Sequence, residues 1–249
     1  MTTADGGAYP SRVHTESISY DVAGTTYIGY LARTTPNGAG VLIAHEGNGL
    51  GPQVKERAHQ LAQLGYTAFA VDYVGGGQVL ADMPSMMAKL GQLRGDPAHV
   101  RALARAGLDQ LVEQPNVDPK RIAVIGYCFG GTFALELARD GADLAATVAF
   151  HAGLRTANAD DAHNITGKVL ACIGADDPLV PADERLVFET EMRAAKVDWE
   201  LQIFGNAVHG FANPNAGHLG IASVQYNEAA HRRSWQSMLR LFGETIDRS

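Results

Sequence analysis

The segment Gly126-Tyr127-Cys128-Phe129-Gly130-Gly131 constrains the fold of this chain more than any other. It follows a short apolar run, residues 122–125, and precedes a segment with helical spacing of apolar residues. A sharp turn from strand to helix holds the residue at the turn in a strained backbone conformation, and it needs small residues two positions before and after. Glycines occupy both positions around Cys128. The pattern therefore predicts a strand, a tight turn that carries a cysteine, and a helix.

Short apolar runs alternate with helical patterns along the rest of the chain, without a repeat of fixed period. The predicted strands cover residues 12–20, 26–31, 41–44, 67–71, 122–125, 144–150, 169–173 and 199–204. The predicted helices cover residues 52–64, 97–111, 182–195 and 226–246, and another begins directly after the cysteine turn. The first two strands are expected to form an antiparallel hairpin at the sheet edge. This order predicts an α/β fold with a mostly parallel central sheet and helices on both faces.

Composition and charge exclude several classes of protein. A chain of 249 residues with 46% hydrophobic and 19% charged residues is expected to form one domain, residues 1–249. The net charge of −7, without a block of Lys or Arg, predicts no binding to nucleic acid or anionic membrane. Residues 1–15 have no apolar core of a secretion signal, and no run reaches the ~18 apolar residues of a membrane span. We therefore expect a cytoplasmic protein with reduced cysteines.

The two cysteines, Cys128 and Cys172, differ in setting. At the turn, Cys128 lies at a helix N-terminus, which favours the thiolate, and the amide of Phe129 can point at a developing oxyanion. A buried structural role is the alternative for Cys128. Cys172 lies within an apolar run, so we predict that it packs in the core of a strand.

An acid and a base follow Cys128 in the order that hydrolases with such a turn require. Asp176 and Asp177 come directly after a predicted strand, and Asp177, which precedes Pro178, is the better candidate. His209 lies in the loop after the last predicted strand and is the candidate base. His151, after the strand that ends at residue 150, is a weaker candidate base and is expected to line the pocket. Other histidines, including His231, are expected in surface loops.

The segment between residues 75 and 95 allows two interpretations. It begins with Gly75-Gly76-Gly77 and carries Met83, Met86 and Met87. It could form a mobile lid, but methionines that pack an ordinary helix are the more common explanation.

Three motifs resemble the dienelactone hydrolase family over residues 41–242: Ala44-His45-Glu46, the cysteine turn, and the pair formed by residues 177–181 and His209-Gly210-Phe211. The resemblance implies an α/β-hydrolase fold and an enzyme that cleaves small esters or lactones through a thioester, without metal or organic cofactor. It implies that Glu46 contacts the nucleophile and helps to take its proton when substrate binds, and that the amide of Gly47 completes the oxyanion hole with that of Phe129.

The chain departs from the family pattern where the substrate carboxylate is held. The family has an arginine four residues after the catalytic histidine, and here that residue is Asn213. A second arginine is expected between residues 75 and 94, where Arg94 is the candidate. Dienelactone itself is therefore not the expected native substrate. His151, Asn213 and Tyr73 are predicted to contact the substrate.

A second hypothesis is a non-catalytic or redox-sensing protein on the same fold, with Cys128 as an oxidisable thiol near Glu46. Such a sensor does not require Asp177 and His209, so the presence of that pair favours the enzyme. The sequence leaves open whether the protein is a monomer or a homodimer.

Overall fold

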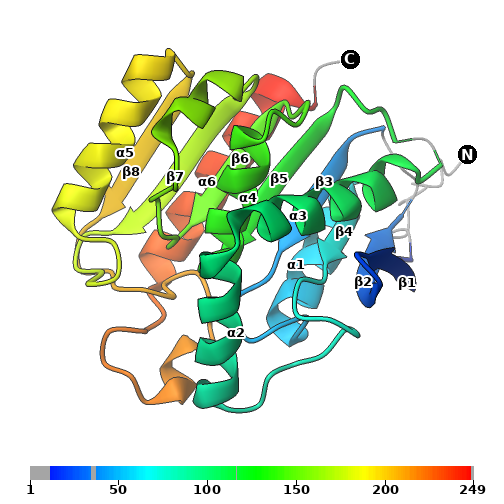
Figure 1. The fold of residues 1–249 in the computed structure, drawn as a ribbon, viewed down its shortest axis with the longest axis horizontal. Coiled ribbons are helices and arrows are strands. Elements are labelled where there is room, and N and C mark those ends of the chain that lie inside the picture. The colour runs from blue at the N-terminus through cyan, green and yellow to red at the C-terminus, as the bar shows by residue number, and fades with distance from the viewer. Residues whose placement is uncertain (1–11, 35–37, 116, 248–249) are drawn as a thin grey trace, which may run out of the picture.

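The computed structural model describes residues 12–34, 38–115 and 117–247 (Figure 1). Most of the N-terminal segment considered above for a secretion signal lies outside the described residues. Among the described helices, none combines the length and apolarity needed to cross a bilayer.

The described residues form one eight-stranded sheet with helices around it. Its strands are β1 (His14–Val22), β2 (Thr25–Arg33), β3 (Gly40–Ala44), β4 (Thr67–Val71), β5 (Ile122–Tyr127), β6 (Ala146–Phe150), β7 (Lys168–Gly174) and β8 (Trp199–Phe204). The α-helices are α1 (Pro52–Gln63), α2 (Met83–Gly95), α3 (Pro97–Val112), α4 (Phe129–Arg139), α5 (Ala182–Ala195) and α6 (Glu228–Thr245). Two short 3₁₀ helices, η1 (Ala159–Asn164) and η2 (Ala216–Leu219), complete the described elements.

The strand order is β1-β2-β4-β3-β5-β6-β7-β8. The hairpin of β1 and β2 pairs antiparallel with Tyr20 opposite Tyr27, and β2 joins β4 antiparallel. All the other neighbouring strands are parallel. The predicted fold class, a mostly parallel sheet with an antiparallel hairpin at one edge, is confirmed.

Both faces of the central strands are covered, which explains their continuous apolar runs. In β3, Val41 and Ile43 pack in a cluster with residues of α1 and α6, whereas Leu42 and Ala44 pack in a cluster with residues of α3 and α4. Helix α5 covers the same face as α4 further along the sheet, over β7. Figure 1 shows α1 and α6 behind the sheet and α3, α4 and α5 in front of it.

Helix α2 stands apart from these layers. Figure 1 shows it beyond the carboxyl ends of the strands, near the segment that connects β8 to α6. Only Leu90 and Leu93 of α2 are buried, and the side chain of Met86 packs partly against the core. Met83 and Met87 are 37% and 50% exposed. The expectation that these methionines pack an ordinary helix is therefore wrong for two of the three, because α2 extends past the sheet that would have covered them.

The connection between β4 and α2 is tied down by the buried carboxylate of Asp72. This carboxylate accepts hydrogen bonds from the amides of Ile28, Val74, Gly75 and Gly77 at 2.7–3.1 Å. The glycines allow this arrangement because residues 75, 76 and 77 all have positive φ, a conformation that costs glycine little. The start of the 75–95 segment is thus fixed to β2 and β4.

Candidate active site

Cys128 lies at the turn between β5, which ends at Tyr127, and α4, which begins at Phe129. Its backbone has φ 56° and ψ −123°, which is a strained conformation for a residue with a Cβ. The amide of Cys128 donates to the carbonyl of Phe150 at 3.0 Å, and its side chain is partly exposed. The turn therefore presents the thiol at the carboxyl edge of the sheet.

The glycines around Cys128 are required by close backbone approaches. A Cβ on Gly126 would lie 1.9 Å from the carbonyl oxygen of Gly130, and a Cβ on Gly130 would lie 2.3 Å from that of Ala44. A Cβ on Gly131 would lie 2.4 Å from the Cβ of Ala152. The steric reason expected from the sequence is thus present in the structure.

Asp177 and His209 meet across the ends of β7 and β8. His209 Nδ1 lies 2.8 Å from Asp177 Oδ2, and the other carboxylate oxygen of Asp177 accepts from the amide of Leu179 at 2.8 Å. Both side chains are buried, whereas Asp176 is exposed. The structure therefore brings Asp177, and not Asp176, to His209.

The surroundings of His209 favour its protonated form. Burial by itself lowers the pKa of His209, but the Cys128 thiolate and the hydrogen-bonded Asp177 carboxylate outweigh it and raise the pKa to about 10. His209 Nε2 is buried, and a hydrogen bond between the His209 ring and the Cys128 side chain is a further cause of the raised pKa. With Nδ1 held by Asp177, Nε2 is the nitrogen that can exchange a proton with a bound molecule.

Glu46 follows β3 and lies at the same edge of the sheet. Its Oε2 accepts from Asn213 Nδ2 at 2.7 Å, and its Oε1 lies 3.9 Å from His151 Nε2. Burial raises the pKa of Glu46, and the Asn213 hydrogen bond and the charges of His209 and Arg57 oppose that rise. This carboxylate is consequently a better proton acceptor than an exposed one.

Two of the residues predicted to contact substrate have protein partners instead. Asn213 is only 8% exposed, and its amide group binds Glu46. Tyr73 is wholly buried, and its hydroxyl donates to the carbonyls of His45 and Glu46. These contacts place both residues around the loop that carries Glu46 and Gly47, so a direct contact with substrate stays a prediction.

His151, the third predicted substrate contact, follows β6 and has a φ of 40°. Both of its ring nitrogens are buried and lack hydrogen-bond partners among the described residues. Burial lowers the pKa of His151 well below its usual value, so the ring is neutral. The ring packs edge-on against His209, with 5.1 Å between centroids, and against Phe211, with 5.2 Å.

The two amides expected to form an oxyanion hole come from adjacent strands. Gly47 lies in the loop after β3, and Phe129 begins the helix after β5, the neighbour of β3. Both residues are buried. Leu90 of α2 covers Gly47 so closely that a Cβ there would lie 2.8 Å from Leu90 Cδ1. Helix α2 therefore forms part of the wall of the site.

Arg57 on α1 is a residue near the site that the sequence reasoning missed. It is 5% exposed, and its guanidinium influences the pKa of Glu46 and of His151. The burial of Arg57 could have been predicted from the sequence, because this residue lies three positions after Val54 and four before Leu61, on the apolar face of the helix.

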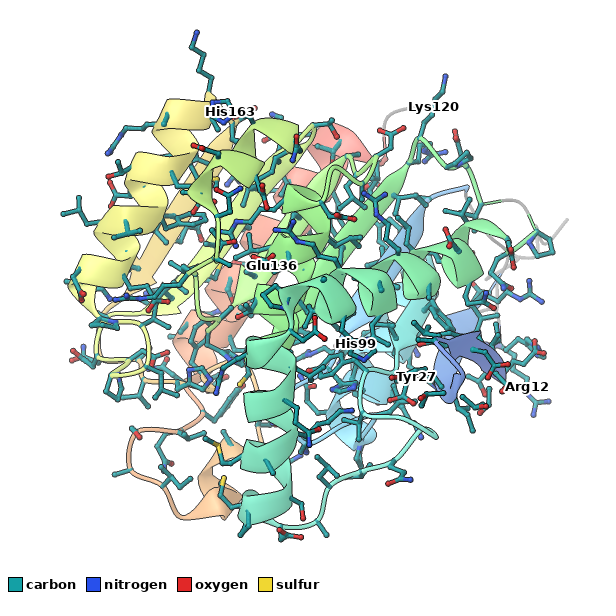
Figure 2. All side chains as sticks on the ribbon, viewed as in Figure 1. Arg12, Tyr27, His99, Lys120, Glu136 and His163 are labelled. Carbon is teal, nitrogen blue, oxygen red and sulfur yellow. The ribbon has the colours of Figure 1, made fainter. Side chains whose placement is uncertain are left out.

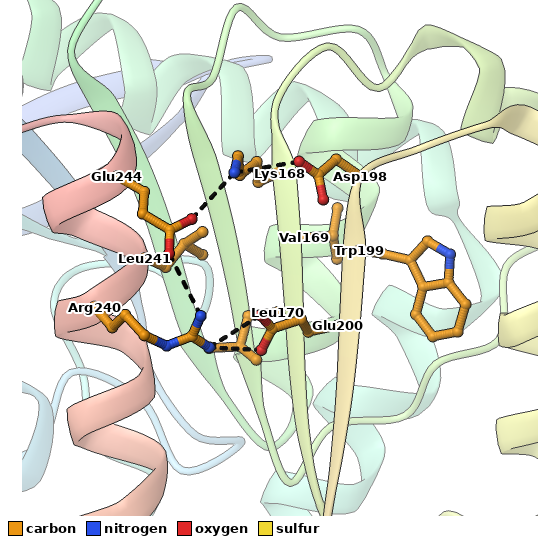
Figure 3. A pocket seen from close by; sticks show the side chains of 9 residues that line it. All are labelled: Lys168, Val169, Leu170, Asp198, Trp199, Glu200, Arg240, Leu241 and Glu244. Atoms are coloured by element: carbon orange, nitrogen blue, oxygen red, sulfur yellow. Dashed lines mark hydrogen bonds and ion pairs between the residues drawn. The ribbon is translucent and has the colours of Figure 1, made fainter.

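Other features lie away from this edge of the sheet. A cavity of about 30 Å³ near the amino ends of β7 and β8 has its charged side chains paired, with Lys168 3.1 Å from Glu244 and Arg240 2.7 Å from Glu200 (Figure 3). Lys120 and His163 point outward at the end of the molecule opposite α2 (Figure 2). Neither region offers the mix of nucleophile, acid and base found around Cys128.

Comparison with known proteins agrees with this description. A sequence model of the Dienelactone hydrolase family matches residues 28–246. "Protein usf" of Aquifex pyrophilus is 30% identical over 237 residues, which are 93% of this chain and 99% of that protein. A Bradyrhizobium protein named "Probable 2-oxo-3-(5-oxofuran-2-ylidene)propanoate lactonase" is 27% identical over 79% of this chain and 86% of its own length.

Among solved structures, a dienelactone hydrolase-like promiscuous phosphotriesterase from metagenomic libraries superposes with a TM-score of 0.89. It is 43% identical and covers 93% of this chain and 98% of its own. The sheet and its helices thus define a member of the α/β-hydrolase class. Within that class, the chain belongs to the dienelactone hydrolase family. The enzyme class expected from the sequence, a hydrolase of carboxylic ester or lactone bonds, is that of this family.

Proposed function

We propose that this protein hydrolyses small ester or lactone bonds through a covalent thioester on Cys128, with His209 and Asp177 completing the triad. The observation that carries the proposal is the 2.8 Å contact between His209 and Asp177 at the edge of the sheet where Cys128 sits in a strained turn. Strained, exposed nucleophiles and buried acid–base pairs are typical of covalent hydrolases.

In the first half-reaction the Cys128 thiolate attacks the acyl carbon and forms a C–S bond. The carbonyl oxygen becomes an oxyanion that the amides of Gly47 and Phe129 stabilise. The bond to the leaving oxygen then breaks, and that oxygen takes the proton from the His209 imidazolium. Where Cys128 enters as a neutral thiol, Glu46 is the second group able to accept its proton.

In the second half-reaction neutral His209 takes a proton from water as the water oxygen attacks the thioester. The C–S bond breaks, which releases the carboxylic acid and restores the thiolate and the imidazolium. The charge pattern suits both steps. The thiolate helps to hold the pKa of His209 near 10, and acylation removes that negative charge, so His209 becomes a competent base only when the thioester is present.

The surroundings of His209 favour an uncharged substrate. Asn213 occupies the position where an arginine would hold a substrate carboxylate, and its amide is engaged by Glu46. We therefore propose a neutral lactone or ester as the substrate. A neutral phosphotriester is the second candidate, supported by the same lack of a cation at residue 213 and by the activity named for the metagenomic relative.

The test compares hydrolysis of p-nitrophenyl acetate, a carboxylated enol-lactone and a neutral p-nitrophenyl phosphotriester. Wild type, Cys128→Ala and Cys172→Ala are measured, and acyl-enzyme is sought by mass spectrometry. We expect Cys128→Ala to lose at least ~10³-fold in ester turnover and all acylation. Cys172→Ala, which removes the other thiol, should keep the activity because Cys172 is a buried strand residue.

Full turnover in Cys128→Ala would exclude the thioester mechanism. Turnover of the enol-lactone that exceeds that of the simple ester would contradict the preference for uncharged substrates. If no substrate acylates Cys128 while mild peroxide converts it to a sulfenic acid, the redox-sensing hypothesis becomes the better one.

A further inference from the structure

Helix α1 buries a cation directly behind the candidate active site. Arg57 Nη1 donates to Gln60 Oε1 at 2.7 Å, and Nη2 donates to the carbonyl of Ala212 at 2.9 Å. Nη2 also lies 2.7 Å from His231 Nε2. Burial and the charge of Arg57 lower the pKa of His231 to about 4, so the His231 nitrogen accepts this bond. The expected surface position of His231 is thus wrong, because its ring is half-buried against Arg57.

Among the described residues, no carboxylate pairs directly with this guanidinium. Its Nε is buried without a hydrogen-bond partner in the same part of the chain. The faces of Tyr127 and Trp235 lie 5.8 and 5.2 Å from the guanidinium carbon. A buried charge is costly unless hydrogen bonds and nearby charges offset that cost, so the groups that Arg57 contacts are the place to look for its effect.

Two of the residues that Arg57 contacts, Ala212 and Tyr127, directly precede residues of the candidate site. Ala212, whose carbonyl it binds, directly precedes Asn213, and Asn213 holds the carboxylate of Glu46 at 2.7 Å. Tyr127, over which its guanidinium lies, directly precedes Cys128. The positive charge of Arg57 also opposes the effect of burial on Glu46.

The other groups around Glu46 do not supply a lasting positive charge. These groups are His151 after β6, His209 after β8, Tyr73 after β4 and Tyr127 on β5. His151 is neutral because burial lowers its pKa, and the two tyrosines are neutral because burial raises theirs. In the proposed cycle His209 gives up its proton after acylation, which leaves Arg57 as the cation that persists throughout.

We propose that Arg57 is a positioning residue that fixes the segment of Ala212 and Asn213, which holds the Glu46 carboxylate, and that supplies a lasting positive charge to that side of the site. The inference rests on the proposed function only in giving Glu46 a part in catalysis. The charge coupling itself can be measured without any substrate.

The experiment follows the Glu46 carboxyl by ¹³C NMR titration of the full chain with labelled glutamate, with Glu46→Gln to assign the signal. Arg57→Gln removes the charge, Arg57→Met removes it while keeping an apolar stem beside Tyr127 and Trp235, and Arg57→Lys restores it. We expect the Glu46 titration midpoint to move to higher pH in the two neutral variants and to stay near wild type in Arg57→Lys. Arg232→Gln removes an exposed arginine that lines the same surface pocket as Arg57, His231 and Trp235, and it should leave the midpoint unchanged.

The activity profile provides the second readout. In Arg57→Gln or Arg57→Met, the acidic limb of the profile of kcat/KM against pH for p-nitrophenyl acetate should shift to higher pH, as the Glu46 midpoint does. A folded neutral variant with an unchanged Glu46 midpoint would overturn the proposal, as would an equal shift in Arg232→Gln. The two proposals can fail separately. If the Glu46 midpoint shifts in the Arg57 variants but Cys128→Ala still hydrolyses the ester, the effect of Arg57 on Glu46 stands and only the thioester mechanism is refuted.

Discussion

The residues of the candidate site are held in conformations that the surrounding structure has to stabilise. Cys128 and His151 follow neighbouring parallel strands, and both have positive φ, 56° and 40°. Each backbone amide in this turn region is secured, since Cys128 donates to Phe150 and His151 donates to Cys172. Strain of this kind persists only where the contacts around it are strong, and it is frequent at active sites.

The charge state of His209 is the most direct test of the site at this scale. Its pKa of about 10 lies above the usual 6.5, so the contact with Asp177 stabilises the folded state fully below pH 6.5 and loses that contribution as the pH rises through 10. We expect Cys128→Ala to lower the pKa of His209, because the thiolate is removed while Asp177 remains. NMR of the imidazole protons against pH measures this, with Cys172→Ala as the control. An unchanged His209 pKa in Cys128→Ala would mean that the thiol does not act on the ring.

The candidate residues could be predicted where local pattern sufficed. The glycines mark Cys128, and the order along the chain selects Asp177 and His209. The hydrogen-bond partners of the Asn213 and Tyr73 side chains could not be predicted. These partners, Glu46 and the backbone of His45, are more than twenty-five residues away in sequence.

At the scale of elements, the strand–turn–helix unit depends on backbone contacts that leave no room for a methyl group. The strand bounds followed from apolar runs, and β4 and β8 coincide with the predicted segments. Helix α2 was ambiguous, because its pattern carries little amphipathic signal and it contacts the remainder of the fold through few residues.

Two glycine substitutions separate packing from helix propensity. Gly126→Ala should destabilise the protein by at least ~1–3 kcal/mol, since the new Cβ would meet backbone at 1.9 Å. Gly243→Ala, in α6 with nothing within 4 Å of its Cβ position, should stabilise by about 0.5–1 kcal/mol. Urea unfolding followed by circular dichroism checks both. Equal effects of the two would show that the close approach at the turn does not exist in solution.

At the scale of the whole molecule, a buried charge network joins the layer of helices in front of the sheet. Arg139 is wholly buried, and it pairs with Glu191 of α5 at 2.8 Å and with Glu136 of its own helix at 3.1 Å. Glu136, which is labelled near the centre of Figure 2 and is buried, also binds Arg101 of α3 at 2.8 Å. The network crosses α3, α4 and α5. Strand order and fold class could be predicted from the sequence, but this network could not, since its charges look like ordinary surface residues until the helices are packed.

Arg139→Met should reduce the free energy of unfolding by ~3–5 kcal/mol, because it leaves the buried carboxylate of Glu191 without its cation and removes one of the two cations that pair with Glu136. Arg193→Met, which breaks an exposed pair with Glu189 and a contact of the guanidinium with the Trp199 ring at 5.6 Å, should cost no more than about 1 kcal/mol. Chemical denaturation of both variants gives the comparison. Similar losses would indicate that the Arg139 network is hydrated rather than buried.

The carboxylate of Asp72 also holds the irregular segment between β4 and α2 in place through its hydrogen bonds. Its four amide donors include three that belong to no strand or helix, Val74, Gly75 and Gly77. In hydrogen–deuterium exchange we expect these three amides to exchange slowly, as strand amides do, together with that of Gly76, which donates to the carbonyl of Thr26 at 3.1 Å, while those of residues 81–82 exchange quickly. Asp72→Asn should release the protected set together. Fast exchange of these amides in the wild type would show that their hydrogen bonds to Asp72 break transiently. Helix α2 would then move as a unit about a hinge at the glycines.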